Sequence, residues 1–244
     1  MNLLIAIDDT DNKESIGTGR LARMLAQDLT DSGLIKQKGI TRHQFLVHPD
    51  IPYTSHNSCA CIEADAETAN TDKIFDFSKN FILAHFNEGA NPGLCVLDRE
   101  RVPKELVRLG RRAQTEVIAI EDARKLADQL GITVWWHGDT GQGVIGAMGG
   151  IGLRSTGNDG KFIGMEGIRE MEGTVTVGEI CRKTSIMRVI TPTGEVLGEN
   201  ETVNTMNWIR PLLKDGNIVL PVLKEEDEWR TIEKAKRKKG KGKI

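Results

Sequence analysis

Several features that would set a chain apart from ordinary globular enzymes are missing here. The 244 residues contain no run of 18 apolar residues, so we expect no membrane-spanning helix. None of the four cysteines forms a C-x-x-C pair, which argues against a zinc finger or a redox motif. No repeat of fixed period occurs, which argues against a solenoid. The first residues read as a strand followed by acids, so we expect no signal or transit peptide and a cytoplasmic location.

Basic residues are concentrated at one end of the chain, and acidic residues outnumber them elsewhere. Residues 234–244 carry seven Lys and Arg and no acid, whereas the rest of the chain carries 26 basic and 35 acidic side chains. The whole chain has a net charge of −2, and without this tail the net charge is −9. Residues 1–233, with this negative net charge, do not have the basic character typical of proteins that bind nucleic acid over a broad surface. The tail predicts a weak electrostatic contact with nucleic acid, and the alternative is a disordered solubilising end.

The most informative stretch is an apolar run that ends in acids. Residues 3–7 are all apolar, which predicts a strand buried on both faces, as in a parallel sheet. Asp8, Asp9 and Asp11 follow at once. Three such carboxylates repel one another unless a cation lies among them, and their hard oxygen atoms suit Mg²⁺. We therefore predict a metal site, and the alternative is a solvated acidic loop that caps the next helix.

A glycine turn follows the acids and opens a predicted helix. Gly17, Thr18 and Gly19 stand directly before a helical pattern over residues 20–29. Small residues at such a place let backbone N–H groups and the helix N-terminus face an anion. We predict that these three residues and Thr10 bind the phosphate groups of a nucleotide.

A second stretch repeats this order of features. Residues 132–137 read as a strand, and an acidic glycine loop and a helix rich in small residues follow it. We predict that Gly141, Gln142 and Gly143 also contact phosphate. The alternative is that the small residues let the helix pack closely on a sheet, and both interpretations can hold together.

The patterns along the chain predict a mixed α/β fold in two parts. Strand and helix patterns alternate over residues 1–165, which we expect to form a large α/β region. Residues 166–233 read as a small β-rich module, and residues 234–244 form the basic tail. The strand candidates of the module are residues 174–177, 187–190, 195–197 and 218–222.

Four segments carry a resemblance to a known family. They are Ile5-Ala-Ile-Asp-Asp-Thr-Asp11, the loop from His48 to Asn57, Asn91-Pro-Gly93 and the stretch from Gly141 to Ala147. In this order they resemble the archaeal isoleucine-tRNA agmatinylcytidine synthetase family over roughly residues 1–165. The resemblance implies a kinase-like α/β domain with a ferredoxin-like domain. It also implies that ATP activates a cytidine carbonyl of tRNA, that agmatine displaces the phosphate, and that the acids handle ATP and Mg²⁺.

The chain departs from the family pattern in two respects. The family's acidic stretch is followed by Gly-Met-Cys-Thr-Thr, whose threonines take part in phosphorylation, whereas residues 17–21 read Gly-Thr-Gly-Arg-Leu. Thr18 is the only hydroxyl close by beyond Ser15, and Arg20 instead offers a planar cation that could clamp a phosphate. The family's zinc ribbon has no counterpart among the cysteines, and a small module stands where its OB-fold would follow. The acceptor therefore need not be tRNA.

Two functional hypotheses follow. The first is an ATP- and Mg²⁺-dependent enzyme, ligase-like or kinase-like, that activates an acceptor oxygen by phosphoryl or nucleotidyl transfer. Its catalytic residues would be the three acids and Arg20, and its acceptor a small molecule or RNA. The second is a non-enzymatic nucleotide-sensing or partner-binding protein on the same fold.

The loop before residue 59 supplies the candidate acceptor pocket. In the enzymatic interpretation His56, Asn57 and Ser58 line this pocket beside the phosphates, and a His could move a proton. In the alternative they hold a proline-bent loop in shape through local hydrogen bonds.

Overall fold

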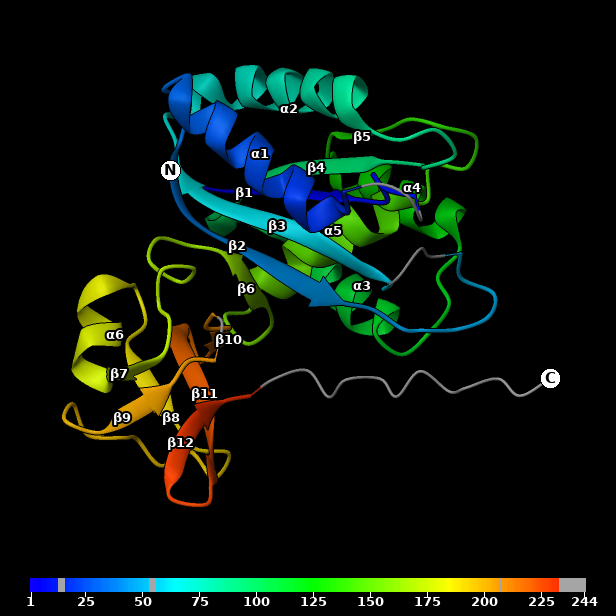
Figure 1. The fold of residues 1–244 in the computed structure, drawn as a ribbon. Coiled ribbons are helices and arrows are strands. Elements are labelled where there is room, and N and C mark those ends of the chain that lie inside the picture. The colour runs from blue at the N-terminus through cyan, green and yellow to red at the C-terminus, as the bar shows by residue number, and fades with distance from the viewer. Residues whose placement is uncertain (13–15, 53–55, 207, 233–244) are drawn as a thin grey trace. The chain divides into compact units, whose positions relative to one another are not determined.

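The chain forms two compact units (Figure 1). The computed structural model describes residues 1–12, 16–52, 56–206 and 208–232. Unit 1 comprises residues 1–166 and 212–217, and unit 2 comprises residues 167–211 and the chain from residue 218. The basic tail from residue 234 lies outside the described residues. No helix in the described part has the length and apolar content needed to cross a membrane.

The first half of unit 1 has the element order strand, helix, strand, strand, helix, strand. Strand β1 lies between β3 and β4 and is antiparallel to both, and β2 is antiparallel to β3 on its other side. This is a split β-α-β arrangement. The elements are β1 (Asn2–Asp8), α1 (Thr18–Asp31), β2 (Lys36–Gln44), β3 (Ser58–Asp65), α2 (Thr71–His85) and β4 (Gly93–Asp98).

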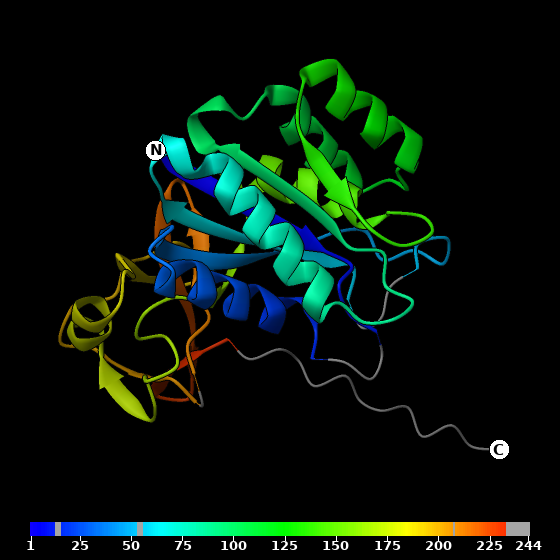
Figure 2. The same ribbon diagram turned by 90° about the horizontal axis from the view of Figure 1, so that it is seen from above.

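The second half of unit 1 adds three helices and extends the sheet at both edges. The strand order becomes β5-β4-β1-β3-β2-β6-β10, and each of these pairs is antiparallel. Figure 2 shows α1 and α2 on one face of this sheet and α3, α4 and α5 on the other. The added elements are α3 (Lys104–Ala113), α4 (Ile120–Leu130), β5 (Val134–Trp136), α5 (Gly143–Ser155), β6 (Lys161–Gly164) and β10 (Leu212–Lys214).

Strand β1 is the centre of the unit 1 core. Its residues 3–7 are completely buried, and their side chains alternate between the two faces. Leu3, Ile5 and Ile7 pack in one cluster with α1 and α2, and Leu4 and Ala6 pack in the other with α3 and α5. The predicted strand buried on both faces is confirmed, but the predicted parallel neighbours are wrong. Helices cover both faces here, so an antiparallel central strand reads as a continuous apolar run.

Unit 2 is built from short strands and one short helix. Strand β12 is antiparallel to β11 and parallel to β9, β9 is antiparallel to β7, and β8 is parallel to β11. The elements are β7 (Thr174–Thr176), α6 (Val177–Lys183), β8 (Arg188–Ile190), β9 (Thr202–Asn204), β11 (Asn217–Glu225) and β12 (Glu228–Thr231).

Two details of unit 2 differ from the sequence-based expectation. The predicted strand over residues 195–197 is wrong, since Val196 forms only an isolated bridge with Ile190. The strand expected over residues 174–177 ends at Thr176, whose hydroxyl accepts a hydrogen bond from the N–H of Glu179 at 3.2 Å. A threonine followed three residues later by a glutamate is a capping signal, and here it starts α6.

Candidate active site

One end of the unit 1 sheet collects the predicted site residues. Strands β1, β2 and β5 end there, at Asp8, Gln44 and Trp136, because they run antiparallel to β3 and β4. Strands β3 and β4 begin at this same end, at Ser58 and Gly93. The loops that carry the acids, the acceptor-loop candidates and the second glycine loop therefore converge, although the sheet is not parallel.

Asp8 and Asp9 form a partly buried pair of acids. The Asp8 carboxylate lies against the start of α5, where a Cβ added at Gly146 would overlap its oxygen. Asp9 has the left-handed φ of +51°, and its N–H donates to Asp8 Oδ1 at 2.8 Å. Burial and the nearby carboxylates raise the pKa of Asp8 to about 8 and that of Asp9 to about 6. A bound cation would favour the charged forms of both acids.

Hydroxyl groups connect the acids to the first turn of α1. Thr10 Oγ1 donates to Thr18 Oγ1 at 3.0 Å, and Thr18 Oγ1 donates to Asp11 Oδ1 at 3.2 Å. Both threonines are buried, with exposures of 1% and 8%. The sequence of small residues allows this close approach, since Gly17 adopts a φ of +79° just before the helix.

The described residues accept hydrogen bonds from only some of the N–H groups in the first turn of α1. The N–H groups of Arg20 and Leu21 donate to the oxygen of Gly17. Those of Thr18 and Gly19 donate to no residue in the described ranges. Arg20 is exposed on this same turn. First-turn N–H groups without a helical partner form the kind of place where anions bind.

Asn91 joins the acids to the second glycine loop. Its backbone N–H donates to Asp9 Oδ2 at 3.3 Å, and its backbone oxygen accepts from the N–H of Gly143 at 3.0 Å. Its side-chain Oδ1 accepts from the N–H of Thr140 at 2.9 Å. No local pattern in the sequence predicts a role for Asn91. The only signal for it was the Asn91-Pro-Gly93 segment of the family resemblance.

The backbone N–H groups of the second glycine loop donate to acceptors within the protein. The N–H of Gly143 is bonded to Asn91, that of Val144 donates to Gly141 at 3.1 Å, and that of Ile145 donates to Gln142 at 3.0 Å. A Cβ added at Gly143 would lie 2.7 Å from the backbone oxygen of Asp8. This geometry favours the packing interpretation for Gly143. The α1 turn is the better placed of the two predicted phosphate sites.

The acceptor-loop candidates lie at the same end of the sheet. Asn57 holds the two arms of the loop together, because its Nδ2 donates to Leu46 at 2.7 Å and its oxygen accepts from Phe45 at 2.8 Å. Ser58 begins β3, and His56 is exposed. The contacts of Asn57 support the local structural interpretation for that residue. Residues 53–55 of this loop lie outside the described part of the chain.

The donor set suits a magnesium ion held together with phosphate. Across the described ranges, no three His, Cys, Asp or Glu side chains are grouped closely enough to hold a metal ion by themselves. Mg²⁺ is commonly bound by only one or two carboxylates plus substrate phosphates and water. Burial and the neighbouring carboxylates raise the pKa values of Asp8 and Asp9, so a cation bound among these acids would favour their charged forms. The residues therefore fit the ion.

Comparisons in sequence and in structure point to one family. No family model matches the chain. The isoleucine-tRNA 2-agmatinylcytidine synthetase TiaS of Pyrococcus horikoshii is 31% identical over 157 residues, which are 62% of this chain and 36% of that protein. The crystal structure of a tRNA fluorescent labeling enzyme has a TM-score of 0.55 at 26% identity. That of TiaS in complex with its isoleucine tRNA and ATP has a TM-score of 0.54 at 25% identity.

These matches cover only part of the proteins compared. The match with each of the two structures covers 62% of this chain and 36% of the chain in that structure. The chain thus spans roughly a third of the length of the relatives it matches. The resemblance found in the sequence is confirmed over that share: the chain is a partial relative of the isoleucine-tRNA 2-agmatinylcytidine synthetase family.

Proposed function

We propose that this chain is an ATP-dependent enzyme that activates an acceptor oxygen by phosphoryl or nucleotidyl transfer. One observation carries the proposal: the acids Asp8, Asp9 and Asp11 and the first turn of α1 lie at the same end of the unit 1 sheet, where Thr18 Oγ1 donates to Asp11 Oδ1. A solved structure that is similar to 62% of this chain is a complex with an isoleucine tRNA and ATP. Mg²⁺ and a small-molecule or RNA acceptor complete the proposal.

Different residues would bind the phosphate groups and the metal ion. The N–H groups of Thr18 and Gly19 would bind phosphate oxygens, and Arg20 would add a planar cation on the same turn. Asp9 and Asp11 would hold Mg²⁺, which supplies charge neutralisation on the phosphates. Asp8 Oδ1 accepts a hydrogen bond from the backbone N–H of Asp9 and would hold the backbone of this residue in place. Catalysis would consist mostly of positioning and electrostatic stabilisation.

A thermal-shift experiment tests the site. We expect ATP to raise the melting temperature only when Mg²⁺ is present, because metal-free carboxylates repel the phosphates. Asp9→Asn should remove this shift while leaving the metal-free melting temperature equal or higher. Asp128→Asn on the exposed side of α4 is the matched control and should keep the shift. The proposal fails if EDTA leaves the ATP shift intact, or if Asp9→Asn binds Mg-ATP as well as the parent.

A second candidate function is nucleotide sensing without turnover. It is favoured by Thr18, a residue that is 8% exposed and whose hydroxyl is already hydrogen-bonded to Thr10 and Asp11. The family's paired threonines are also absent from this turn. Release of ADP, AMP or pyrophosphate from ATP separates the two functions. Saturable ATP binding without any of these products, over a screen of amines and RNA, would favour sensing.

A further inference from the structure

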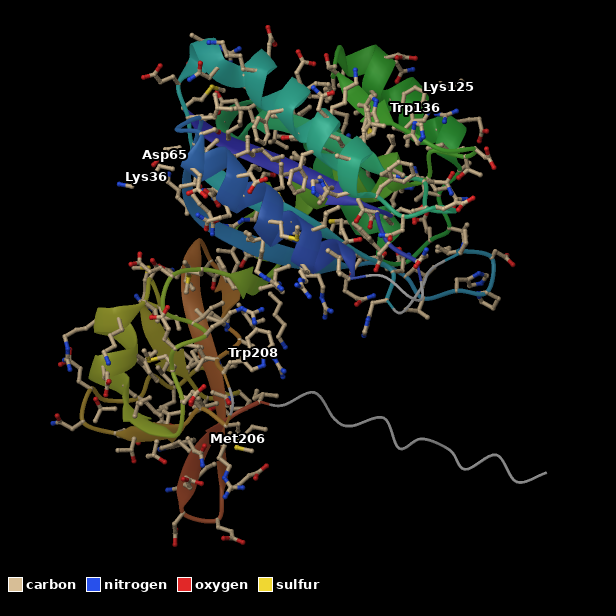
Figure 3. All side chains as sticks on the ribbon, turned by 45° about the horizontal axis from the view of Figure 1, so that its top comes forward. Lys36, Asp65, Lys125, Trp136, Met206 and Trp208 are labelled. Carbon is tan, nitrogen blue, oxygen red and sulfur yellow. The ribbon has the colours of Figure 1, made fainter. Side chains whose placement is uncertain are left out.

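A tryptophan and an arginine are stacked at the same end of the sheet. Trp136 closes β5 and is 40% exposed (Figure 3), and the guanidinium carbon of Arg124 lies 4.4 Å from the centroid of its ring. Arg124 Nη2 donates to the oxygen of Thr140 at 2.9 Å. Its buried Nε has no hydrogen-bond partner among the residues that the structure describes. The arginine is thus fixed beneath a ring that remains open to solvent.

Trp136 lies in one row of the sheet with Asp8. Gly93 on β4 lies opposite Asp8 on one side and opposite Trp136 on the other. Residues in one row of a sheet point to the same face, so Asp8 and Trp136 both point toward the α5 side. Two strand spacings separate their backbones by about 10 Å. The backbone of Gly143 and Val144 at the start of α5 lies directly over Gly93, where an added Cβ would overlap both residues. A nucleotide that reaches from Asp9 to Trp136 would therefore pass beyond the end of the strands and not along this row.

A continuous line of contacts joins the two ends of this row. Asp9 accepts from the N–H of Asn91, and the Asn91 side chain accepts from the N–H of Thr140. The oxygen of Thr140 accepts from Arg124, which stacks on Trp136. The position of the ring is therefore set by the same residues that hold the Asp9 carboxylate.

We infer that Trp136, supported by Arg124, is the surface on which the base of the bound nucleotide stacks. The inference rests on the proposed function, since the phosphates are placed by the acids and α1. An exposed indole offers a flat π-surface for a base, and a guanidinium on the ring adds cation–π stabilisation. Stacking of this kind tolerates different bases, because every base has a π-face. Trp136 is therefore a binding residue that separates nucleotides from bare polyphosphates.

Calorimetric titration with Mg-ATP and with magnesium tripolyphosphate tests the inference. The parent protein should bind ATP about tenfold more tightly than tripolyphosphate, as expected for one stacked base. Trp136→Leu should remove this advantage and leave tripolyphosphate affinity unchanged, and Trp136→Phe should retain most of it. Trp208→Leu is the matched control, since Trp208 in unit 2 also lies against arginines, Arg169 at 4.7 Å and Arg210 at 4.6 Å. This control should bind both ligands as the parent does.

The outcomes separate this inference from the proposed function. Equal ATP affinity in the parent and in Trp136→Leu overturns the inference and leaves the proposed function standing. A parent that binds neither ligand overturns both. If Trp136→Leu does not fold, the fluorescence of the parent and of Trp136→Phe decides the matter, because the parent has four tryptophans. ATP, but not tripolyphosphate, should quench the indole fluorescence of the parent, and this quenching should be absent from Trp136→Phe. Quenching of equal size by both ligands, or by neither while both bind, overturns the inference.

Discussion

Gly146 determines where the Asp8 carboxylate can lie. A Cβ at this position would overlap that carboxylate, so Gly146→Ala must displace either Asp8 or α5. Alanine gains about 1 kcal/mol of helix propensity over glycine. Overpacking costs about 1–3 kcal/mol, and we expect it to dominate because the carboxylate is held from both sides. Urea denaturation of Gly146→Ala should therefore show a lower free energy of unfolding, together with a smaller thermal shift by Mg-ATP.

The control for this substitution is Gly198→Ala in unit 2. Nothing lies within 4 Å of a Cβ added at Gly198, so this variant should unfold with nearly the free energy of the parent. If Gly146→Ala is as stable as the parent and keeps the Mg-ATP shift, the close contact between Asp8 and α5 is not needed for either property.

His43 makes the stability of unit 1 depend on pH. The ring is completely buried, with Nδ1 2.8 Å from Asp159 Oδ1 and Nε2 2.8 Å from Thr41 Oγ1. Burial lowers the pKa of His43, against the opposing effect of Asp159. An unfolded histidine takes up a proton below about pH 6.5, and the folded one does not. The contribution of His43 is thus fully present above that pH and is lost as the pH falls toward the folded pKa.

The measurement compares the parent with His43→Gln at each pH, since other groups also titrate. The difference in free energy of unfolding should shrink between pH 7.5 and pH 5.5, by at most about 1.4 kcal/mol for each pH unit below 6.5. A difference that stays constant over this range would show that His43 keeps the same protonation in the folded and unfolded states.

At the scale of elements, a buried ion pair ties β3 to α5. Arg154 of α5 contacts Glu63 Oε2, and both side chains are buried, with exposures of 5% and 6%. Asn2 Nδ2 and Arg99 Nη1 donate to the other oxygen of Glu63, at 2.8 Å and 3.2 Å. Glu63→Gln leaves the Arg154 charge without its partner, so we expect it to lower the free energy of unfolding by about 3–5 kcal/mol.

The comparison variant is Asp65→Asn at the end of the same strand. Its partner is Lys38 at 2.6 Å, and the two side chains are 42% and 52% exposed. Solvent screens such a pair, so this loss should be below about 1 kcal/mol. Equal losses in the two variants would contradict a special role for the buried pair.

Local sequence patterns predicted the helices and strands of unit 1 better than the direction in which neighbouring strands pair. The apolar run at residues 3–7 identified β1, and the acids after it lie at the end of the sheet where the candidate site residues meet. The direction of neighbouring strands is decided by the connections, and residues 3–7 read the same in either case. Asn91 was missed as a site residue because its hydrogen bonds reach segments far away in the sequence, which no local pattern records.

The glycines of α5 show the same limit. Gly141 to Gly143 have the composition of a phosphate loop, and the sequence left packing and phosphate contact both open. Only the backbone hydrogen bonds show that the donors of Gly143 and Val144 are already used within the protein. The α1 turn has a similar composition, but there the N–H groups of Thr18 and Gly19 donate to none of the residues that the structure describes.

For the whole molecule, the distribution of charge governs contact with nucleic acid. The net charge is −9 without residues 234–244, which carry seven of the basic side chains. Removing this segment should weaken binding to tRNA and flatten the dependence of affinity on salt, because each lost phosphate contact reduces counterion release. Titration of tRNA at several salt concentrations, with the full chain and with residues 1–233, measures both effects. A shortened chain that still binds a particular tRNA tightly at physiological salt would contradict this prediction.

The path of the chain has a consequence for how unit 1 is synthesised. Strand β10 pairs with β6 within unit 1, but residues 167–211, which belong to unit 2, are made between them. While the protein leaves the ribosome, the edge of β6 that pairs with β10 therefore stays unpaired until β10 has been made. An open strand edge is a template for pairing with another chain. The nascent protein is most exposed to misassembly on a crowded polysome until residue 217 has emerged, and this period ends only when much of unit 2 already exists.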